Sequence, residues 1–144
     1  MGNAIQKRGP DSHGEWSDGI NIGLSHRRLS IFDLSSAGHQ PMISPNQRFI
    51  LAFNGEIYNF GELRQDLISQ GVSFLGFSDT EVLFHLLQRE GAKILPKLRG
   101  IFAFAFYTPE TNTVLLGRDA FGVKPLYFKA HNDSVVFGSE LKAL

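Results

Sequence analysis

The stretch Phe53-Asn54-Gly55-Glu56-Ile57-Tyr58-Asn59 joins two different hydrophobic patterns. Before it, Phe49 to Phe53 is a continuous apolar run, which predicts a strand buried on both faces. After it, Asn59 begins a segment with helical periodicity. Polar residues beside a glycine at a strand end often hold a ligand, because glycine lets other atoms approach the backbone closely. This junction is therefore the candidate site.

Two amphipathic helices are expected in mid-chain, each followed by a glycine that ends it. Asn59 and Glu62 have the spacing of a capping box at the first helix, and Ser78 and Glu81 have the same spacing at the second. The apolar stripes predicted to face the core are Phe60, Leu63, Leu67 and Ile68 in the first helix, and Val82, Leu83, Leu86 and Leu87 in the second.

At least six strands are expected in all. A second strand buried on both faces is predicted at Ile101 to Phe106, where large and small residues alternate. The shorter expected strands are residues 20–25, 72–77, 114–117, 126–129 and 135–138. Residues 1–19 and 35–46 are expected to form turns and loops. Hairpins combined with two consecutive helices indicate an α+β fold rather than alternating β-α-β units.

Composition narrows the class of protein. A chain of 144 residues with 42% hydrophobic residues and thirteen Phe suits one domain with an aromatic core. The formal net charge is zero and the Lys and Arg residues are scattered, which argues against a nucleic-acid partner or an anionic membrane surface. Without a long apolar run or a signal peptide, we expect a soluble cytoplasmic protein. The sequence has no cysteine, which excludes disulfides, zinc-thiolate sites and a catalytic thiol within it.

Asn54, Gly55 and Glu56 allow two interpretations. Asn and Gly are the ordinary residues of a turn, where they are chosen for conformation alone. The Asn side-chain amide and the Gly N–H are also two donors that can point at one oxygen, as in an oxyanion hole. Glu56 is suited to accept a hydrogen bond from a substrate amide or amine.

Arg28 and Asp79 are weaker candidates on spacing alone. Arg28 follows the first expected strand, and its planar guanidinium is either a solvated surface charge or a two-bond ligand for a carboxylate. Asp79 stands at a helix N-terminus, where a carboxylate is favourable in any case, and it is also able to bind an ammonium group. Together the two residues have the chemistry to hold both ends of an α-amino acid. The five histidines show no metal-ligand spacing, so no metal site is predicted.

Several motifs in order make the chain resemble a known family. They are Arg8-Gly9-Pro10-Asp11, His26 through Asp33, His39-Gln40-Pro41-Met42, Phe53 through Asn59, Ser78-Asp79-Thr80-Glu81, Gly117-Arg118-Asp119 with Gly122, and Ser139 through Leu144. The chain is similar over nearly its whole length to the class II glutamine amidotransferase domain, in the form found in glutamine-hydrolysing asparagine synthetases. Related amidotransferases acting on a sugar or a peptide precursor remain an alternative.

This resemblance implies the fold and the roles of individual residues. The implied fold is that of N-terminal-nucleophile hydrolases: two antiparallel sheets between helical layers, here incomplete at the N-terminus. Arg28 would bind the carboxylate of L-glutamine and Asp79 its amino group, while Leu29 and Ile31 would offer backbone groups. Asn54 and Gly55 would form the oxyanion hole, and Glu56 would line the pocket.

This sequence departs from the family pattern in one respect. The resemblance also implies partners for the chain. In this family the nucleophile is an N-terminal cysteine whose α-amino group acts as base, and this sequence has none. We therefore expect residues 1–144, as a partial amidotransferase domain, to be inactive alone, with a non-catalytic glutamine-binding or interaction module as the alternative function. No cofactor is expected here; ATP and Mg²⁺ would belong to a C-terminal synthetase domain, the implied partner, in asparagine biosynthesis. A missing strand also predicts an exposed sheet edge and self-association.

Overall fold

The computed structural model describes residues 2–10, 12–28 and 38–144. The strands are β1 (Ser12–Ser17), β2 (Gly23–Arg28), β3 (Met42–Ile43), β4 (Ile50–Ile57), β5 (Gly100–Thr108), β6 (Thr113–Arg118), β7 (Tyr127–His131) and β8 (Ser134–Gly138). The α-helices are α1 (Phe60–Ser69) and α2 (Asp79–Glu90). The 3-10 helices are η1 (Gly2–Arg8), η3 (Gly91–Lys97), η4 (Pro109–Thr111) and η5 (Leu141–Ala143).

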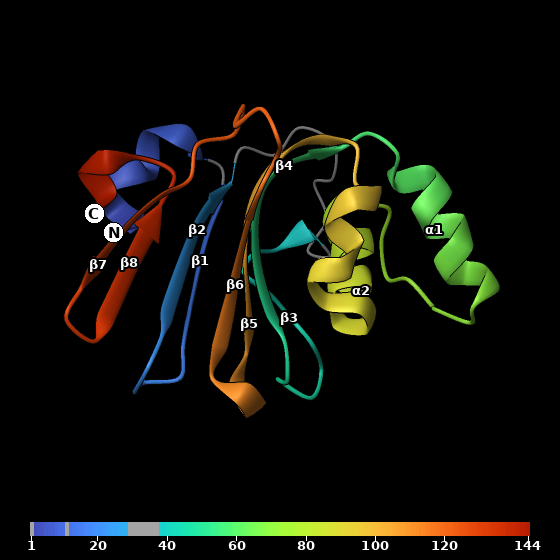
Figure 1. The fold of residues 1–144 in the computed structure, drawn as a ribbon, viewed down its shortest axis with the longest axis horizontal. Helices are drawn as coiled ribbons and strands as arrows, with labels where there is room; N and C mark the ends of the chain where they lie inside the picture. Colours follow the sequence, from blue (N-terminus) through green and yellow to red (C-terminus); the bar gives the residue numbers. More distant parts are fainter. Residues whose placement is uncertain (1, 11, 29–37) are drawn as a thin grey trace.

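A four-stranded antiparallel sheet in the order β3-β4-β5-β6 forms the middle of the molecule. Helices α1 and α2 lie on one side of this sheet, and the hairpins β1–β2 and β7–β8 lie on the other (Figure 1). The sheet is thus covered on both faces, which explains the two continuous apolar runs in its central strands, β4 and β5.

Successive side chains of a strand point to opposite faces, so each central strand supplies two separate cores. Leu51, Phe53 and Ile57 of β4 pack in the larger core, which includes the buried residues of α1 and α2. Ile50 points the other way, into a smaller core with Leu24 of β2 and residues of β5. Odd-numbered residues of β4 therefore face the helices, and even-numbered ones face the hairpins.

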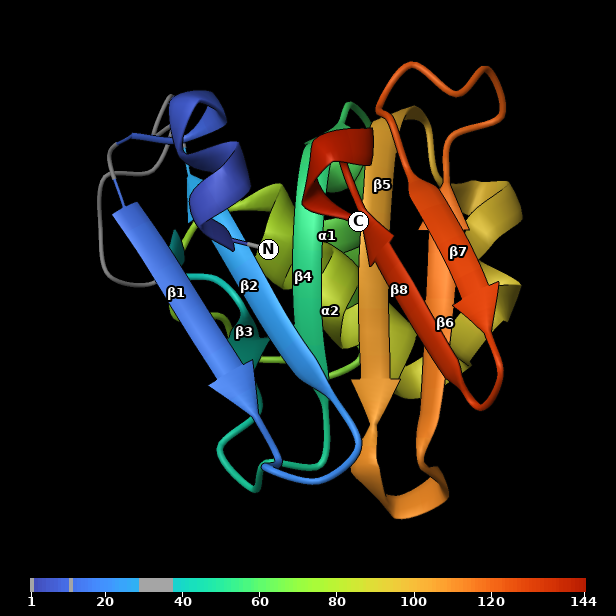
Figure 2. The same cartoon turned by 90° about the vertical axis from the view of Figure 1, so that its left-hand side faces the viewer.

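The two hairpins are separate two-stranded sheets. Figure 2 shows them side by side in front of the central sheet, with β4 and β5 visible between β2 and β8. They cover different parts of the sheet. Among the described residues, no helix is long and apolar enough to cross a membrane.

The main sequence-based predictions of the fold are confirmed. Both doubly buried strands and both consecutive helices are present, and the fold is α+β. Gly71 and Gly91 follow the helices with φ of 84° and 57°, values that favour glycine. The Ser78 hydroxyl accepts a hydrogen bond from the Glu81 N–H and so caps α2 as expected.

The expected cap of α1 is wrong in detail. The helix does begin after Asn59, but the Asn59 side chain makes no hydrogen bond to it. The Asn59 Oδ1 accepts the Arg99 N–H and its Nδ2 donates to the Lys97 carbonyl instead. A tertiary contact to the segment before β5 therefore replaces the local cap. Ile68, predicted to be on the buried stripe, is 43% exposed.

One predicted strand, at residues 20–25, begins later than expected, and another, at residues 72–77, is absent. Residues 20–22 form a turn, because the Asp18 carboxylate accepts the N–H groups of all three, and β2 starts only at Gly23. Residues 72–77 form no strand, and Leu75 and Phe77 are 92% and 80% exposed. Where loops were expected in residues 1–19 and 35–46, the described part contains η1, β1 and the two-residue strand β3.

Candidate functional site

An open cavity of about 2470 Å³ lies between the central sheet and the hairpins. Its lining includes the five candidate residues that the structure describes, which come from β2, β4 and α2: Arg28, Asn54, Gly55, Glu56 and Asp79. Leu29 and Ile31 lie outside the described residues. The structure thus brings together side chains that are up to 51 positions apart in the sequence (Arg28 to Asp79).

Side chains of β4 point alternately to the two faces of the sheet, and this alternation determines which of them reach the cavity. Asn54 and Glu56 are even-numbered, so their side chains leave the sheet on the hairpin side, where the cavity lies. Both are half-buried. A half-buried amide and a half-buried carboxylate on one strand face are accessible to a ligand and partly shielded from water.

The Gly55 N–H points to the free edge of β4. In an antiparallel pair, alternate residues direct their backbone groups to opposite sides of the strand. Phe53 and Ile57 direct theirs away from β5, because their N–H groups donate to the side chains of Gln40 and Asp79. Gly55 lies midway between these two residues, so its N–H points to the same side as theirs. This geometry makes Gly55 a backbone donor at the cavity edge.

Only glycine fits at this position. A Cβ on Gly55 would lie 2.2 Å from the Ile101 carbonyl oxygen and 2.6 Å from the Phe102 Cα, both backbone atoms of β5. Backbone atoms in a paired strand have little room to move. The glycine is therefore required by the close approach of β4 and β5, which the turn interpretation of the sequence did not foresee.

Asp79 is the first residue of α2, and its carboxylate ties the helix to β4. The Asp79 Oδ2 accepts the Ile57 N–H at 2.9 Å. Burial raises the pKa of the Asp79 carboxyl above its usual value, and the nearby Glu56 carboxylate raises it further, although the N–H groups of Ile57 and Thr80 act in the opposite direction. A half-buried acid beside a second acid attracts a cation, and a ligand ammonium group is one such cation.

The segment before Asp79 is fixed by two charged side chains. The buried Glu81 carboxylate accepts the N–H groups of Leu75 and Gly76 at 2.6 and 2.9 Å. The Arg64 guanidinium donates to the Gly76 carbonyl and lies 4.3 Å from the centre of the Phe77 ring. These contacts help to explain why residues 72–77 are not a strand, because backbone groups of Leu75 and Gly76 bond to side chains instead of to a neighbouring strand.

Arg28 is the last residue of β2, and its guanidinium packs on Gly38. A Cβ at Gly38 would lie 2.3 Å from the Arg28 Nη2 and 2.7 Å from its Cζ. Gly38 is buried and lines the same cavity. The absence of a side chain at residue 38 is therefore what allows the Arg28 head group to lie where it does.

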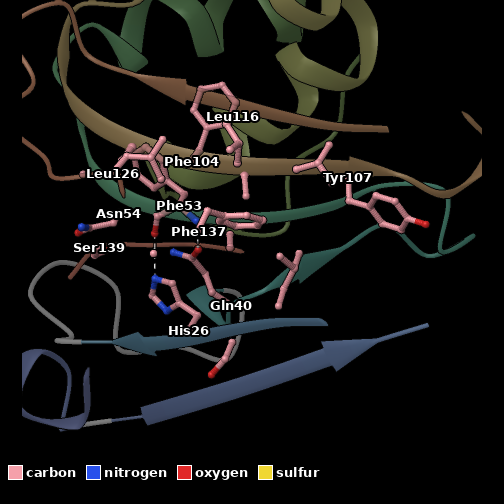
Figure 3. A pocket seen from close by; sticks show the side chains of 18 of the residues that line it. His26, Gln40, Phe53, Asn54, Phe104, Tyr107, Leu116, Leu126, Phe137 and Ser139 are labelled. Carbon is pink, nitrogen blue, oxygen red and sulfur yellow. Dashed lines mark hydrogen bonds between the residues drawn. The ribbon is translucent and has the colours of Figure 1, made fainter. Parts of the chain in front are cut away.

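Two further residues act on this site and were missed from the sequence. The His26 Nε2 lies 2.9 Å from the Phe53 carbonyl oxygen, and the Gln40 Oε1 accepts the Phe53 N–H at 2.6 Å (Figure 3). A carbonyl oxygen only accepts, so the Nε2 of His26 carries the hydrogen. Burial lowers the pKa of His26 to about 4, which keeps the ring neutral at pH 7. His26 stands two residues before Arg28, and that spacing on one strand face is the signal that was available.

The Gly117-Arg118-Asp119 motif has a structural role. The buried Asp119 carboxylate accepts backbone N–H groups from Phe102, Phe121, Val123 and Lys124. The Arg118 guanidinium donates to the carbonyls of Lys124 and Gly122. The two side chains thus fold residues 118–124 into a tight loop beside β5.

The arrangement as a whole suits an α-amino acid with a polar side chain. The groups that line this single cavity include the Arg28 guanidinium, the carboxylates of Glu56 and Asp79, and the Asn54–Gly55 pair of neutral donors. The guanidinium matches a carboxylate, the carboxylates match an ammonium group, and the two neutral donors match a carbonyl oxygen. Among the described residues, no three or more His, Cys, Asp or Glu side chains lie together in a group that could hold a metal ion.

Comparisons with known proteins give one family. The family model described as "Glutamine amidotransferase domain" matches residues 1–144. Asparagine synthetase [glutamine-hydrolyzing] 1 of Bacillus subtilis is 42% identical over 144 residues, which is 100% of this chain and 22% of that protein. Asparagine synthetase B [glutamine-hydrolyzing] of Escherichia coli is 42% identical over 142 residues, 97% of this chain and 25% of that protein. The chain thus spans about a quarter of the length of these relatives.

A solved structure agrees with the fold. The glutamine phosphoribosylpyrophosphate amidotransferase of Bacillus subtilis superposes with a TM-score of 0.73 at 26% identity, over 95% of this chain and 37% of that one. The similarity covers nearly all of this chain, so it extends to the hairpins and helices that frame the cavity as well as to the central sheet.

Proposed function

We propose, from the premise that this chain belongs to the glutamine amidotransferase domain family, that residues 1–144 form the glutamine-binding domain of a longer asparagine synthetase. The longer enzyme would hydrolyse L-glutamine and use the ammonia to amidate an activated aspartate. The observation that carries the proposal is the single cavity lined by Arg28, Asn54, Gly55, Glu56 and Asp79.

Each end of glutamine has a matching group in this cavity. The Arg28 guanidinium would bind the α-carboxylate with two hydrogen bonds, and the Asp79 carboxylate would bind the α-ammonium group. The Asn54 side-chain amide and the Gly55 N–H would donate to the side-chain carbonyl oxygen. Glu56 lies close enough to Asp79 to affect its pKa, which supports a shared role at the cationic end of the ligand.

The donors would contribute most after attack on the glutamine amide. A thiolate adding to the amide carbon forms one C–S bond and turns the carbonyl oxygen into an oxyanion, which the Asn54 and Gly55 donors would stabilise. The C–N bond then breaks, and ammonia leaves with a transferred proton; water hydrolyses the thioester to glutamate. These 144 residues contain no cysteine, so the thiol would have to come from outside them.

Later steps are assigned to a synthetase part of the longer enzyme. ATP and Mg²⁺ would act there, in activating aspartate, and no residue described here is proposed to bind them. A second acceptor class is favoured by one observation: the similar solved structure is an amidotransferase for phosphoribosylpyrophosphate. An acceptor other than aspartate is therefore the alternative, and the partner domain would decide between them.

Titration calorimetry of the 144-residue chain with L-glutamine tests the binding site. We expect one glutamine per chain, with binding lost in Arg28→Ala and kept in Arg48→Ala. Arg48 is a suitable control because it is an exposed arginine whose ion pair with Glu110 lies away from the cavity lining. Failure of the unaltered chain to bind glutamine, or equal binding by Arg28→Ala, would contradict the proposal.

An ammonia assay tests the absence of a nucleophile. Purified chain of confirmed mass should release no ammonia from glutamine above a protein-free control, because the sequence offers no thiol. Release of ammonia by such a sample would show that another side chain attacks the amide.

A further inference from the structure

Phe53 occupies the position on β4 that immediately precedes Asn54 and Gly55, and its backbone groups on the free edge are paired by side chains. The strand on that side, β3, pairs with β4 only through Ile50 and Leu51. Beyond Leu51 no described strand covers this edge, yet Phe53 is a buried residue whose N–H and C=O need partners. The Gln40 side chain accepts from its N–H, and the His26 side chain donates to its C=O.

These two side chains thus take the place of a neighbouring strand for one residue. They arrive from different elements: His26 from β2, and Gln40 from the segment before β3. Both line the cavity, and Figure 3 shows them on the same side of the strand that carries Phe53, each joined to a Phe53 backbone group by a dashed line. Moving either side chain would therefore move the part of β4 that carries the two donors.

The second ring nitrogen of His26, Nδ1, makes no comparable contact with the described residues. The Nδ1 atom is buried and has no hydrogen-bond partner in the part of the chain that the structure describes. Leaving a buried polar atom unpaired costs free energy. The ring is nevertheless held with its Nε2 on the Phe53 carbonyl, which indicates that this one contact outweighs the loss at Nδ1.

We infer that His26 and Gln40 are positioning residues for the glutamine amide: they hold the Phe53 peptide groups so that the Asn54 amide and the Gly55 N–H converge on the side-chain carbonyl of the ligand. This inference rests on the proposed function. Neither residue would touch the ligand. Both act through Phe53, and the ligand's α-carboxylate and α-ammonium ends, bound by Arg28 and Asp79, are not under their control.

Because His26 and Gln40 would affect only the amide end of the ligand, their positioning role can be distinguished from a purely structural one by comparing two ligands. L-Norvaline has the two charged ends of glutamine but no side-chain amide. His26→Leu should therefore weaken binding of glutamine by about tenfold, the loss expected for one poorly aligned hydrogen-bonded group, and leave the affinity for norvaline unchanged. His26→Gln, which keeps a donor near the Nε2 position, should restore glutamine binding to within about twofold.

The matched control is His13→Leu, since His13 is an exposed histidine on the neighbouring strand β1. Gln40→Met removes the partner of the Phe53 N–H and should have the same selective effect, so it decides the question if His26→Leu does not fold. As a second measurement, the amide resonances of Asn54 and Gly55 should shift in His26→Leu and stay in place in His13→Leu.

Three outcomes would overturn the inference. They are equal losses for glutamine and norvaline in His26→Leu, no loss for either ligand, and unshifted resonances of Asn54 and Gly55. Failure of the proposed function looks different: the unaltered chain would bind glutamine no better than norvaline, while the resonances of Asn54 and Gly55 would still report whether His26 sets their geometry.

Discussion

The Nε2–H of His26 on β2 donates to the carbonyl oxygen of Phe53 on β4 over 2.9 Å, and this hydrogen bond joins the first hairpin to the central sheet. The contact requires the neutral ring. A second proton would go on Nδ1, which is buried and has no acceptor among the described residues. The hydrogen bond that shapes the site is therefore also a point at which pH acts on stability.

We predict that acid destabilises the chain through His26. Burial lowers the pKa of His26 from 6.5 to about 4, so between these values the unfolded chain binds a proton that the folded chain does not. Stability must then rise with pH across this window, by about 3 kcal/mol for this residue. Urea unfolding at pH 7, 6 and 5 should show a shallower decline for His26→Gln than for the unaltered chain. Parallel declines would contradict this assignment.

We predict that Gly55→Ala destabilises the fold, because its Cβ would overlap backbone atoms of β5. The expected loss is about 3 kcal/mol, as for other overpacked core positions. The control is Gly61→Ala, an exposed position in α1 with no atom within 4 Å of its Cβ, which should gain about 0.5 kcal/mol from helix propensity. Denaturant midpoints measure both. A Gly55→Ala protein as stable as the unaltered chain would show that the strands can separate at this point.

The sequence predicted the central strands of the sheet better than the segments that connect the elements around it. Ile101 to Phe106 is apolar on both faces, and that pattern suffices to predict β5, because burial of large side chains is a property of the residues themselves. Residues 72–77 include four apolar residues but form no strand. Their partners are the Glu81 carboxylate and the Arg64 guanidinium, and such tertiary contacts leave no periodic signal in the segment itself.

Some residues of the candidate site could likewise be predicted from the sequence, and others could not. Asn54 and Gly55 were identifiable because their types and positions suit donors at a strand end. Gln40 was not, because nothing in its own neighbourhood shows that its amide pairs with Phe53, which is 13 positions away. Gly38 was missed for the same reason: its importance comes from the guanidinium packed on it.

We predict that Gly38→Ala weakens ligand binding with little effect on stability. The added Cβ would meet the Arg28 guanidinium, the end of a flexible side chain that can move aside. Displacing the guanidinium should reduce the affinity for glutamine and for norvaline alike, by about tenfold if both hydrogen bonds to the carboxylate are misaligned. Calorimetry and a thermal melt measure the two effects. Unchanged affinity for both ligands would show that Arg28 does not bind the carboxylate.

The ionised form of Asp79 is destabilising when no ligand is bound. Its pKa is raised mainly by burial and also by Glu56. The folded state therefore holds a proton on this carboxyl at pH values where an unfolded aspartate has lost it, so ionisation above that range reduces stability. Asp79→Asn keeps an oxygen for the Ile57 N–H and removes the charge. We expect this variant to be at least as stable as the unaltered chain at pH 7, by thermal melting.

The same variant should lose glutamine, because an ammonium group binds the carboxylate and not the neutral amide. In the unaltered chain, affinity should fall as the pH is lowered through the raised pKa of Asp79, beginning above the usual aspartate value of 3.8. Calorimetry from pH 7 downwards measures this decline, and Asp66→Asn, at an exposed position of α1, is the control. Should Asp79→Asn bind glutamine as tightly as Asp66→Asn does, the ammonium group is held by another residue, and Glu56, the carboxylate beside Asp79, is the one to alter next.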